Sequence, residues 1–209
     1  MRLILASASP RRADLLRAAG FTFETVVADV DEAVRAGESP ALYVRRLAAE
    51  KSAAARSAEA SRSSGDGTRG FSRADTIILA ADTTVVVDNE ILGKPHDDSE
   101  AAEMLRRLSG RRHEVLTGVS IRRNAFEVGR VETTGVCFAA LTPDEVAWYV
   151  GSGEGRDKAG SYAIQGLASR FVTRIEGSYS NVVGLPVAAV VELLTEAGFF
   201  QEERRKSRG

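Results

Sequence analysis

A continuous apolar segment near the middle of the chain most limits the folds that it can adopt. Residues 76–81 form this run, and residues 85–87 continue it as far as a turn signal at Asp88-Asn89. A strand without polar alternation is buried on both faces, like the central strands of sheets that are covered by helices. We therefore expect a sheet with helices on its faces. Asp82-Thr83-Thr84 is expected at an end of this strand or at a break in it.

The first third of the chain predicts a strand and two helices, over residues 2–6, 11–19 and 39–56. Ser9 is the expected N-cap of the first helix, and Pro10 stands at its first position, where a missing N–H has no cost. Residues 57–73 are rich in Ser, Gly, Arg and Ala and have no periodicity. This composition predicts a flexible surface loop.

The rest of the chain predicts strands over residues 115–121, 131–140 and 171–175, and helices over 98–108, from 142 onward and over 186–197. Asp98 is the expected cap of the first of these helices, and Thr142 with Glu145 has the spacing of a capping box. The two long strands are expected to form a hairpin. The order of elements predicts an α/β fold, with an extended mixed β-sheet flanked by helices in one domain over 1–198 and a charged tail over 199–209.

Composition disfavours several classes of function. Charged residues are 27% of the 209 residues and the net charge is −1, so the basic stripe of a nucleic-acid module is not expected. The apolar run at the N-terminus is too short for a signal peptide or a membrane span, which favours a cytoplasmic location. Four of the 28 basic residues are lysines, namely Lys51, Lys94, Lys158 and Lys206. In a chain that otherwise uses arginine, the first three indicate positions that need a compact ammonium group, whereas Lys206 in the tail is uninformative.

The segment between the first strand and the first helix has the residues of a phosphate site. Its sequence is Ser7-Ala8-Ser9-Pro10-Arg11-Arg12. A helix N-terminus offers free N–H groups, and arginines bind phosphate oxygens in pairs. The alternative is an ordinary capped helix with solvated arginines. Walker and dinucleotide-binding motifs are absent from the sequence, which disfavours kinases and dehydrogenases.

Carboxylates are the candidate reactive groups, because the chain has only two histidines. Asp82 follows the apolar strand, where a carboxylate is costly unless a cation or metal balances it. Glu32 lies in an acidic cluster and could supply a second oxygen ligand, which suits Mg²⁺ or Mn²⁺. The sequence thus offers cations that can bind a polyanion, carboxylates that can hold a metal, and a carboxylate that can orient or deprotonate water. Together these indicate triphosphate hydrolysis, with attack at the α-phosphorus and loss of pyrophosphate.

Seven segments between residues 3 and 197 together resemble the Maf family of septum-formation proteins, which are nucleoside triphosphate pyrophosphatases. The segments are Leu3 to Arg12, Ala81-Asp82-Thr83, Gly93-Lys94-Pro95, Leu116-Thr117-Gly118-Val119, Asp157-Lys158-Ala159-Gly160, Tyr162-Ala163-Ile164-Gln165-Gly166 and Gly177 to Pro186. The resemblance implies two lobes around an extended mixed sheet, as in inosine-triphosphate pyrophosphatases, with the active site in the cleft between them. It also implies a homodimer.

The resemblance further implies roles for individual residues. Asp82 takes the position of the catalytic proton acceptor and Glu32 that of its acidic companion, and the two are the expected metal ligands. Phosphate-binding positions fall on Ser7, Arg12, Lys51 and Lys94. Three residues resemble the subtype that acts on dTTP and UTP, namely Arg11, Thr83 and Gln165. The alternatives are the subtype that prefers 7-methyl-GTP and a nucleotide-binding regulator of cell division in which hydrolysis is secondary.

Gln165 also has a chemical reason for its expected role. Its amide carries both donors and acceptors, which match the imide edge of uracil or thymine. The alternative is a glutamine that binds the backbone of its own loop. Lys158 could likewise hold its loop in place.

Overall fold

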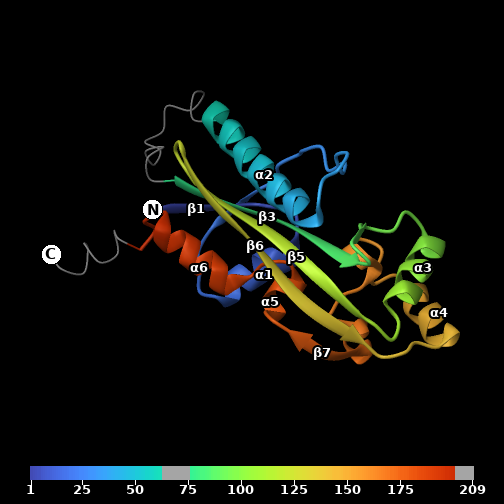
Figure 1. Cartoon of the computed structure of the whole chain (residues 1–209). Helices are drawn as coiled ribbons and strands as arrows, with labels where there is room; N and C mark the ends of the chain where they lie inside the picture. Colours follow the sequence, from blue (N-terminus) through green and yellow to red (C-terminus); the bar gives the residue numbers. More distant parts are fainter. Residues whose placement is uncertain (63–75, 201–209) are drawn as a thin grey trace.

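The computed structural model describes residues 1–62 and 76–200, which form one mixed sheet with helices on both faces (Figure 1). The strands are β1 (Arg2–Ala6), β2 (Glu24–Val26), β3 (Thr76–Val87), β4 (Glu90–Leu92), β5 (Arg112–Arg123), β6 (Phe126–Phe138) and β7 (Val172–Glu176). The α-helices are α1 (Pro10–Ala18), α2 (Pro40–Arg62), α3 (Asp98–Leu108), α4 (Pro143–Gly151), α5 (Tyr179–Val183) and α6 (Val187–Glu196), and the 3₁₀ turns are η2 (Ala159–Ser161) and η3 (Leu167–Phe171).

The strands lie in the order β2-β1-β3-β5-β6-β7, and β4 pairs with β3. β1 is parallel to β2 and β3, whereas the other pairs are antiparallel. The predicted α/β fold with an extended mixed sheet is therefore confirmed. None of the helices in the described part of the chain is both long and apolar enough to span a membrane.

Successive side chains of the central strands enter different hydrophobic clusters. Leu79 packs with residues of α1 and α6, and Ile78 and Ala80 pack with Ala55 of α2. Figure 1 shows α2 on one face of the sheet and α1 and α6 on the other. Because both faces are covered, the segment needs no polar alternation. A further cluster, around Tyr149, fills the other end of the sheet beneath α3 and α4.

The predicted break at Asp82-Thr83-Thr84 is wrong, because β3 continues through it. Asp82 pairs with Gly118 of β5, and the two threonines pair with the preceding two residues of β5. Threonine is β-branched and favours a strand, and Asp82 needs only a cationic partner to be tolerated there. Gly118 also permits a close helix: a Cβ at this residue would lie 2.1 Å from the backbone oxygen of Val44 in α2.

The expected end of α2 near Arg56 is also wrong. The helix continues to Arg62, so the first part of the predicted loop 57–73 is helical, and residues 63–73 lie outside the described part of the chain. Ala58, Glu59 and Ala60 favour a helix. Glu59 also accepts a hydrogen bond of 2.6 Å from Arg2 Nη1, which fastens the last turns of α2 to β1.

Three predictions at helix and strand ends had different outcomes. The capping box at Thr142 and Glu145 is confirmed. The expected cap of α3 is wrong by one residue, because Asp97 accepts the N–H of Glu100 at 2.8 Å and Asp98 lies in the first turn. The hairpin is confirmed but longer than expected, since its strands meet at Asn124, whose positive φ of 53° suits a tight turn.

Candidate active site

One cavity of about 470 Å³ brings together residues from distant parts of the chain. It lies where the β1–α1 loop, the middle of β3, α2 and the irregular segment after α4 approach one another. Its size is within the range of small-molecule sites. All nine predicted site residues line it: Ser7, Arg11, Arg12, Glu32, Lys51, Asp82, Thr83, Lys94 and Gln165.

The N-terminus of α1 forms one wall of this cavity. Ser9 is the N-cap, as predicted, but its side chain makes no capping hydrogen bond, while Ser7 Oγ accepts the N–H of Ser9 at 3.1 Å. The first N–H groups of a helix have no partner within the helix. Those of Arg11 and Arg12 belong to this first turn. The helix therefore offers donors and the positive end of its dipole to an anion in the cavity.

Arg12 adds a fixed positive charge to the same wall. Its Nε donates to the Gly184 carbonyl at 2.8 Å, and its Nη atoms donate to Thr83 Oγ1 at 3.0 Å and Ser7 Oγ at 3.3 Å. All three acceptors are neutral, and no carboxylate of the described residues forms an ion pair with Arg12. Burial lowers the pKa of Arg12, although a guanidinium stays charged at neutral pH. An anionic ligand would balance this charge.

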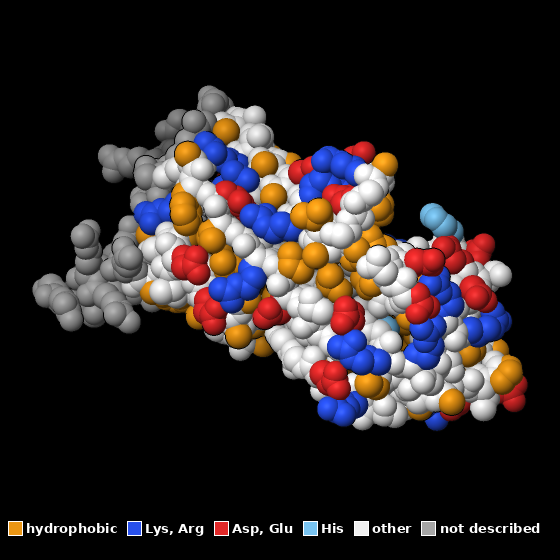
Figure 2. Space-filling model, viewed as in Figure 1, with side chains coloured by type: hydrophobic (Ala, Val, Ile, Leu, Met, Phe, Trp, Pro, Cys, Tyr) orange, Lys and Arg blue, Asp and Glu red, His pale blue; other side chains and the backbone are white. Residues whose placement is uncertain are grey.

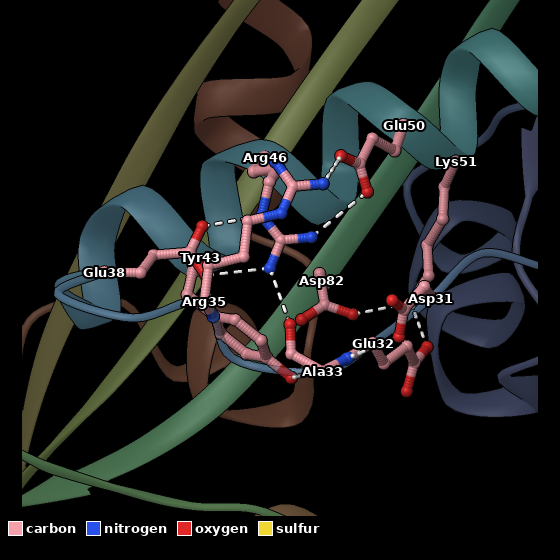
Figure 3. Close-up of polar contacts among 10 residues, drawn as sticks. All are labelled: Asp31, Glu32, Ala33, Arg35, Glu38, Tyr43, Arg46, Glu50, Lys51 and Asp82. Carbon is pink, nitrogen blue, oxygen red and sulfur yellow. Dashed lines mark hydrogen bonds and ion pairs between the residues drawn. The ribbon is translucent and has the colours of Figure 1, made fainter.

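Lys51 lies between the two predicted carboxylates (Figure 3). Its Nζ is 2.6 Å from Asp82 Oδ1 and 2.6 Å from Glu32 Oε1. Lys51 and Asp82 are 9% and 8% exposed, so this pair is shielded from water and its geometry is fixed. Burial opposes the charged form of Glu32, but the hydrogen bond from Lys51 and the charges of nearby cations outweigh it and lower the pKa of Glu32.

The loop that carries Glu32 is held against α2 by Arg46 and Tyr43 (Figure 3). Arg46 donates to the Glu38 carboxylate at 2.6 and 2.8 Å, to Glu50 at 3.1 Å and to the Ala33 carbonyl at 3.0 Å. Tyr43 donates its hydroxyl to the carbonyl of Glu32 at 3.0 Å. Burial and the nearby carboxylates raise the pKa of Tyr43 to about 12, so it remains a donor at neutral pH.

Residues of the base-specificity prediction lie around the same cavity but make different contacts. Thr83 Oγ1 contacts Arg12, Thr117 Oγ1 at 2.9 Å and the Gly184 carbonyl at 3.3 Å, so it supports Arg12 directly. Arg11 forms a 3.6 Å ion pair with Asp157. Gln165 is exposed, and its side-chain amide has no hydrogen-bond partner among the described residues. It therefore does not serve the backbone of its own loop and is free to contact a ligand.

Lys158 holds its own loop. Its Nζ donates to the Glu154 carbonyl and to Asp157 Oδ1, at 2.5 Å each. Lys94 is exposed at the cavity and has no ion pair among the described residues. The sequence thus contains both kinds of lysine, one structural and one available to a ligand.

Sequence reasoning missed Tyr43 and Arg46, and it gave no role to Asp157. Arg46 and Glu50 have the i,i+4 spacing of a helical ion pair, which was a readable signal. The contacts of Arg46 with Glu38 and of Arg11 with Asp157 join segments that no local pattern connects. These residues could be found only from the fold.

The possible metal site consists of two carboxylates rather than a larger cluster. No group of three or more His, Cys, Asp or Glu side chains suited to a metal occurs within residues 1–62 and 76–200. Glu32 and Asp82 instead converge on one ammonium group. Hard oxygen donors of this kind fit Mg²⁺, which is commonly bound by one or two carboxylates together with substrate phosphates.

Comparisons with known proteins identify the family of the chain. The family model described as Maf-like protein matches residues 2–197. The chain is 49% identical over 202 residues to the dTTP/UTP pyrophosphatase of Anaeromyxobacter dehalogenans (strain 2CP-C), with 95% of each chain covered. It is 48% identical to the protein of that name from Symbiobacterium thermophilum, again with 95% of each chain covered. For the Vibrio cholerae protein of that name, identity is 46%, with 92% of this chain and 96% of the relative covered.

The match to the family model covers nearly the whole chain and includes every residue that lines the cavity. The relatives are also similar over almost their full length, so the likeness is not confined to one motif. On these grounds the chain belongs to the family of Maf-like proteins.

Proposed function

We propose that this protein hydrolyses dTTP and UTP to the nucleoside monophosphate and pyrophosphate. One observation carries the proposal: in a single cavity, the buried Asp82–Lys51 pair faces the guanidinium of Arg12 and the N-terminus of α1. This arrangement combines a carboxylate that can accept a proton from water with hydrogen-bond donors that can bind a polyanion. The names of the relatives, dTTP/UTP pyrophosphatases, support the choice of substrate.

The triphosphate binds at the cationic side of the cavity. Arg12 and the first N–H groups of α1 take phosphate oxygens, with Ser7 as a further donor. Lys51 and Lys94 approach from α2 and from the segment after β4. Because Arg12 already has three neutral acceptors, it is oriented before the substrate arrives. Preorganised charges of this kind stabilise a transition state better than mobile ones.

The reaction is an in-line displacement at the α-phosphorus. Asp82 accepts a proton from a water molecule as the water oxygen forms a bond to the α-phosphorus. The bond between that phosphorus and the bridging oxygen breaks, and pyrophosphate leaves with the bonding electrons. Lys51 fixes the orientation of the Asp82 carboxylate through its 2.6 Å contact, while Arg12 and Lys94 offset the charge that grows on the leaving group.

A divalent metal, Mg²⁺ or Mn²⁺, is part of the proposal. Glu32 and Asp82 would hold it, since they are hard oxygen donors that the structure brings close together on either side of the Lys51 ammonium. When bound, such an ion neutralises phosphate charge. The chain's own part is to keep the two carboxylates together, which the contacts of Arg46 and Tyr43 with the Glu32 loop achieve.

The base lies at the opposite side of the cavity, near Gln165. The free amide of Gln165 pairs with the imide edge that uracil and thymine share. Arg11 and Thr83 complete the subtype pattern, Thr83 through its contact with Arg12. The proposal includes a cytoplasmic location and a homodimer.

A pyrophosphate-release assay with Mg²⁺ or Mn²⁺ tests the proposal. The substrates are dTTP, UTP, CTP and 7-methyl-GTP, and the expected order has dTTP and UTP well ahead of the others. Faster release from 7-methyl-GTP would move the protein to the other subtype. Nucleotide binding without pyrophosphate release from any substrate would reject the enzyme and favour a regulator that senses nucleotides.

A further inference from the structure

The turn that carries Gln165 is closed by one backbone hydrogen bond of its own, from the Gly166 N–H to the Ala163 carbonyl at 3.1 Å, and side chains outside it also bind its backbone. It joins η2 to η3, and Ala163, Ile164 and Gln165 line the cavity. The turn has no strand or α-helix of its own. Since the Gln165 amide has no partner among the described residues, the backbone on either side sets only the position from which the side chain extends.

Two side chains, Glu154 and Tyr149, bind that backbone on both sides of Gln165. Glu154 accepts the Leu167 N–H at 2.9 Å, the Ala168 N–H at 3.4 Å and the Tyr149 hydroxyl at 2.7 Å. The Tyr149 oxygen in turn accepts the N–H of Ala163 at 3.1 Å. We refer to Glu154 and Tyr149 as the clamp, because backbone N–H groups on both sides of Gln165 donate hydrogen bonds to these two side chains.

The clamp is rigid at both of its ends. Tyr149 is fully buried in the core beneath α3 and α4, where its ring packs 5.5 Å from that of Phe171. Burial raises the pKa of Tyr149, so its hydroxyl keeps the proton that it donates. At the other end, Gly166 lies against the carboxylate: a Cβ there would be 2.0 Å from Glu154 Oε1. The absence of a side chain at Gly166 is what lets the carboxylate reach the turn.

We propose that the clamp determines base specificity by positioning Gln165 against the edge of the pyrimidine. The inference rests on the proposed function and extends it to two residues that do not touch the base. Uracil and thymine present an N–H between two carbonyls, whereas cytosine presents an amino group and a bare ring nitrogen. An amide oxygen that accepts the ring N–H of uracil meets only an unprotonated ring nitrogen in cytosine, so recognition of uracil in this orientation depends on where the turn holds Gln165. Loss of the clamp therefore weakens the recognition of uracil more than that of cytosine.

The test compares kcat/KM for UTP and CTP in the full chain with Mg²⁺. Tyr149→Phe removes one hydroxyl, and Glu154→Gln keeps the shape of the side chain but replaces an acceptor with a donor. Each is expected to lower the UTP:CTP ratio about tenfold, chiefly by raising KM for UTP, because small displacements of a binding group have effects of this order or larger. Leu105→Val, in the same hydrophobic core but on α3, is the matched control for lost stability. It should lower the melting temperature and leave the ratio unchanged.

A double-mutant cycle separates positioning from a general structural role. In a Gln165→Ala background, Tyr149→Phe should no longer change the UTP:CTP ratio, because the residue that it positions is gone. An unchanged ratio in both clamp variants would overturn the inference, as would an equal fall in the ratio with and without Gln165. Calorimetry with UMP and CMP gives the same comparison without turnover. An inactive wild-type protein that still prefers UMP would therefore reject the hydrolase and keep the clamp.

Discussion

The two ends of the cavity are constructed differently. At the phosphate end, four site residues come from β1, α1, α2 and β3 or lie next to them, and they form two direct pairs, Arg12 with Ser7 and Lys51 with Asp82. At the base end, Gln165 lies on an irregular turn that is held from behind by other side chains. Figure 1 shows the helices that flank the central strands at the first end and the short turns near β7 at the second.

This difference separates chemistry from recognition. Charged side chains at the phosphate end hold each other in place, so a substitution there is expected to affect the hydrolysis of every triphosphate. The base end can change its preference without disturbing Asp82, because its supports lie in a different hydrophobic core. On the face seen in Figure 2, acidic and basic side chains are interspersed, so charge gathered inside the cavity distinguishes the site better than surface charge does.

The largest effect is expected from Asp82→Asn. Asparagine keeps the shape of the side chain but cannot accept the proton of water, so turnover should fall about 10³-fold or more for all triphosphates. Pyrophosphate release measures it, and nucleotide binding by calorimetry should persist. Asp98→Asn, on an exposed ion pair with Arg156, is the control. Near-normal turnover would remove Asp82 from its role.

Arg46→Lys should have a smaller effect, again at the phosphate end. A lysine keeps the charge but cannot span Glu38, Glu50 and the Ala33 carbonyl as the planar guanidinium does. The Glu32 loop is then less fixed, and we expect the Mg²⁺ concentration for half-maximal rate to rise about tenfold, the lower end of what is typical when a group that orients a metal ligand is changed.

The adjacent Arg45→Lys is the matched control, since Arg45 pairs with Glu127 instead. The rise should be equal for UTP and CTP. If it differed between them, the separation of the two ends would be wrong. If no rise occurred, Arg46 would have only a structural role.

The sequence predicted the members of the site better than their supports. Ser7, Arg12 and Asp82 stand in motifs whose chemistry is readable one residue at a time. The continuity of β3 through Asp82 was not readable, because it depends on Lys51, which comes from a helix on the face of the sheet. A propensity rule cannot know that a distant ammonium will balance a carboxylate in a strand.

The fold was predictable where local patterns decided it. The apolar run of β3 and the capping box at Thr142 are examples, since sequence neighbours alone determine them. The end of α2 was not, because Glu59 owes its position to Arg2 of β1. The role of Glu154 was hidden for the same reason: its partners lie up to 14 residues away in a segment without periodicity.

Gln165→Ala tests the base end alone. Removing an amide worth about one net hydrogen bond, roughly 1.4 kcal/mol, should lower the UTP:CTP ratio about tenfold. The rate with CTP and its dependence on Mg²⁺ should stay the same, because the carboxylates are untouched. Substrate competition assays measure the ratio. A parallel fall in both rates would mean that Gln165 supports the phosphate end as well.

The last prediction concerns His113, which lies behind the base end and is expected to affect stability more than the reaction. His113 is 2% exposed, and its Nε2 is 2.8 Å from the hydroxyl of Tyr162, a residue that lines the cavity. Burial, with a smaller contribution from the charge of Arg112, lowers the pKa of His113 to about 4. Between that value and its ordinary pKa near 6.5, the unfolded chain binds a proton that the folded protein does not.

The free energy of unfolding must therefore fall as the pH falls through this window, by an amount proportional to the difference in bound protons. From pH 7 to pH 5, His113 should account for about 2 kcal/mol of this loss. Urea unfolding of the wild type and of His113→Gln at both pH values measures it, and the variant should lose less stability on acidification. Equal losses would show that the imidazole is not held neutral. A smaller loss in the variant would mean that protonation of His113 weakens the core behind the base end.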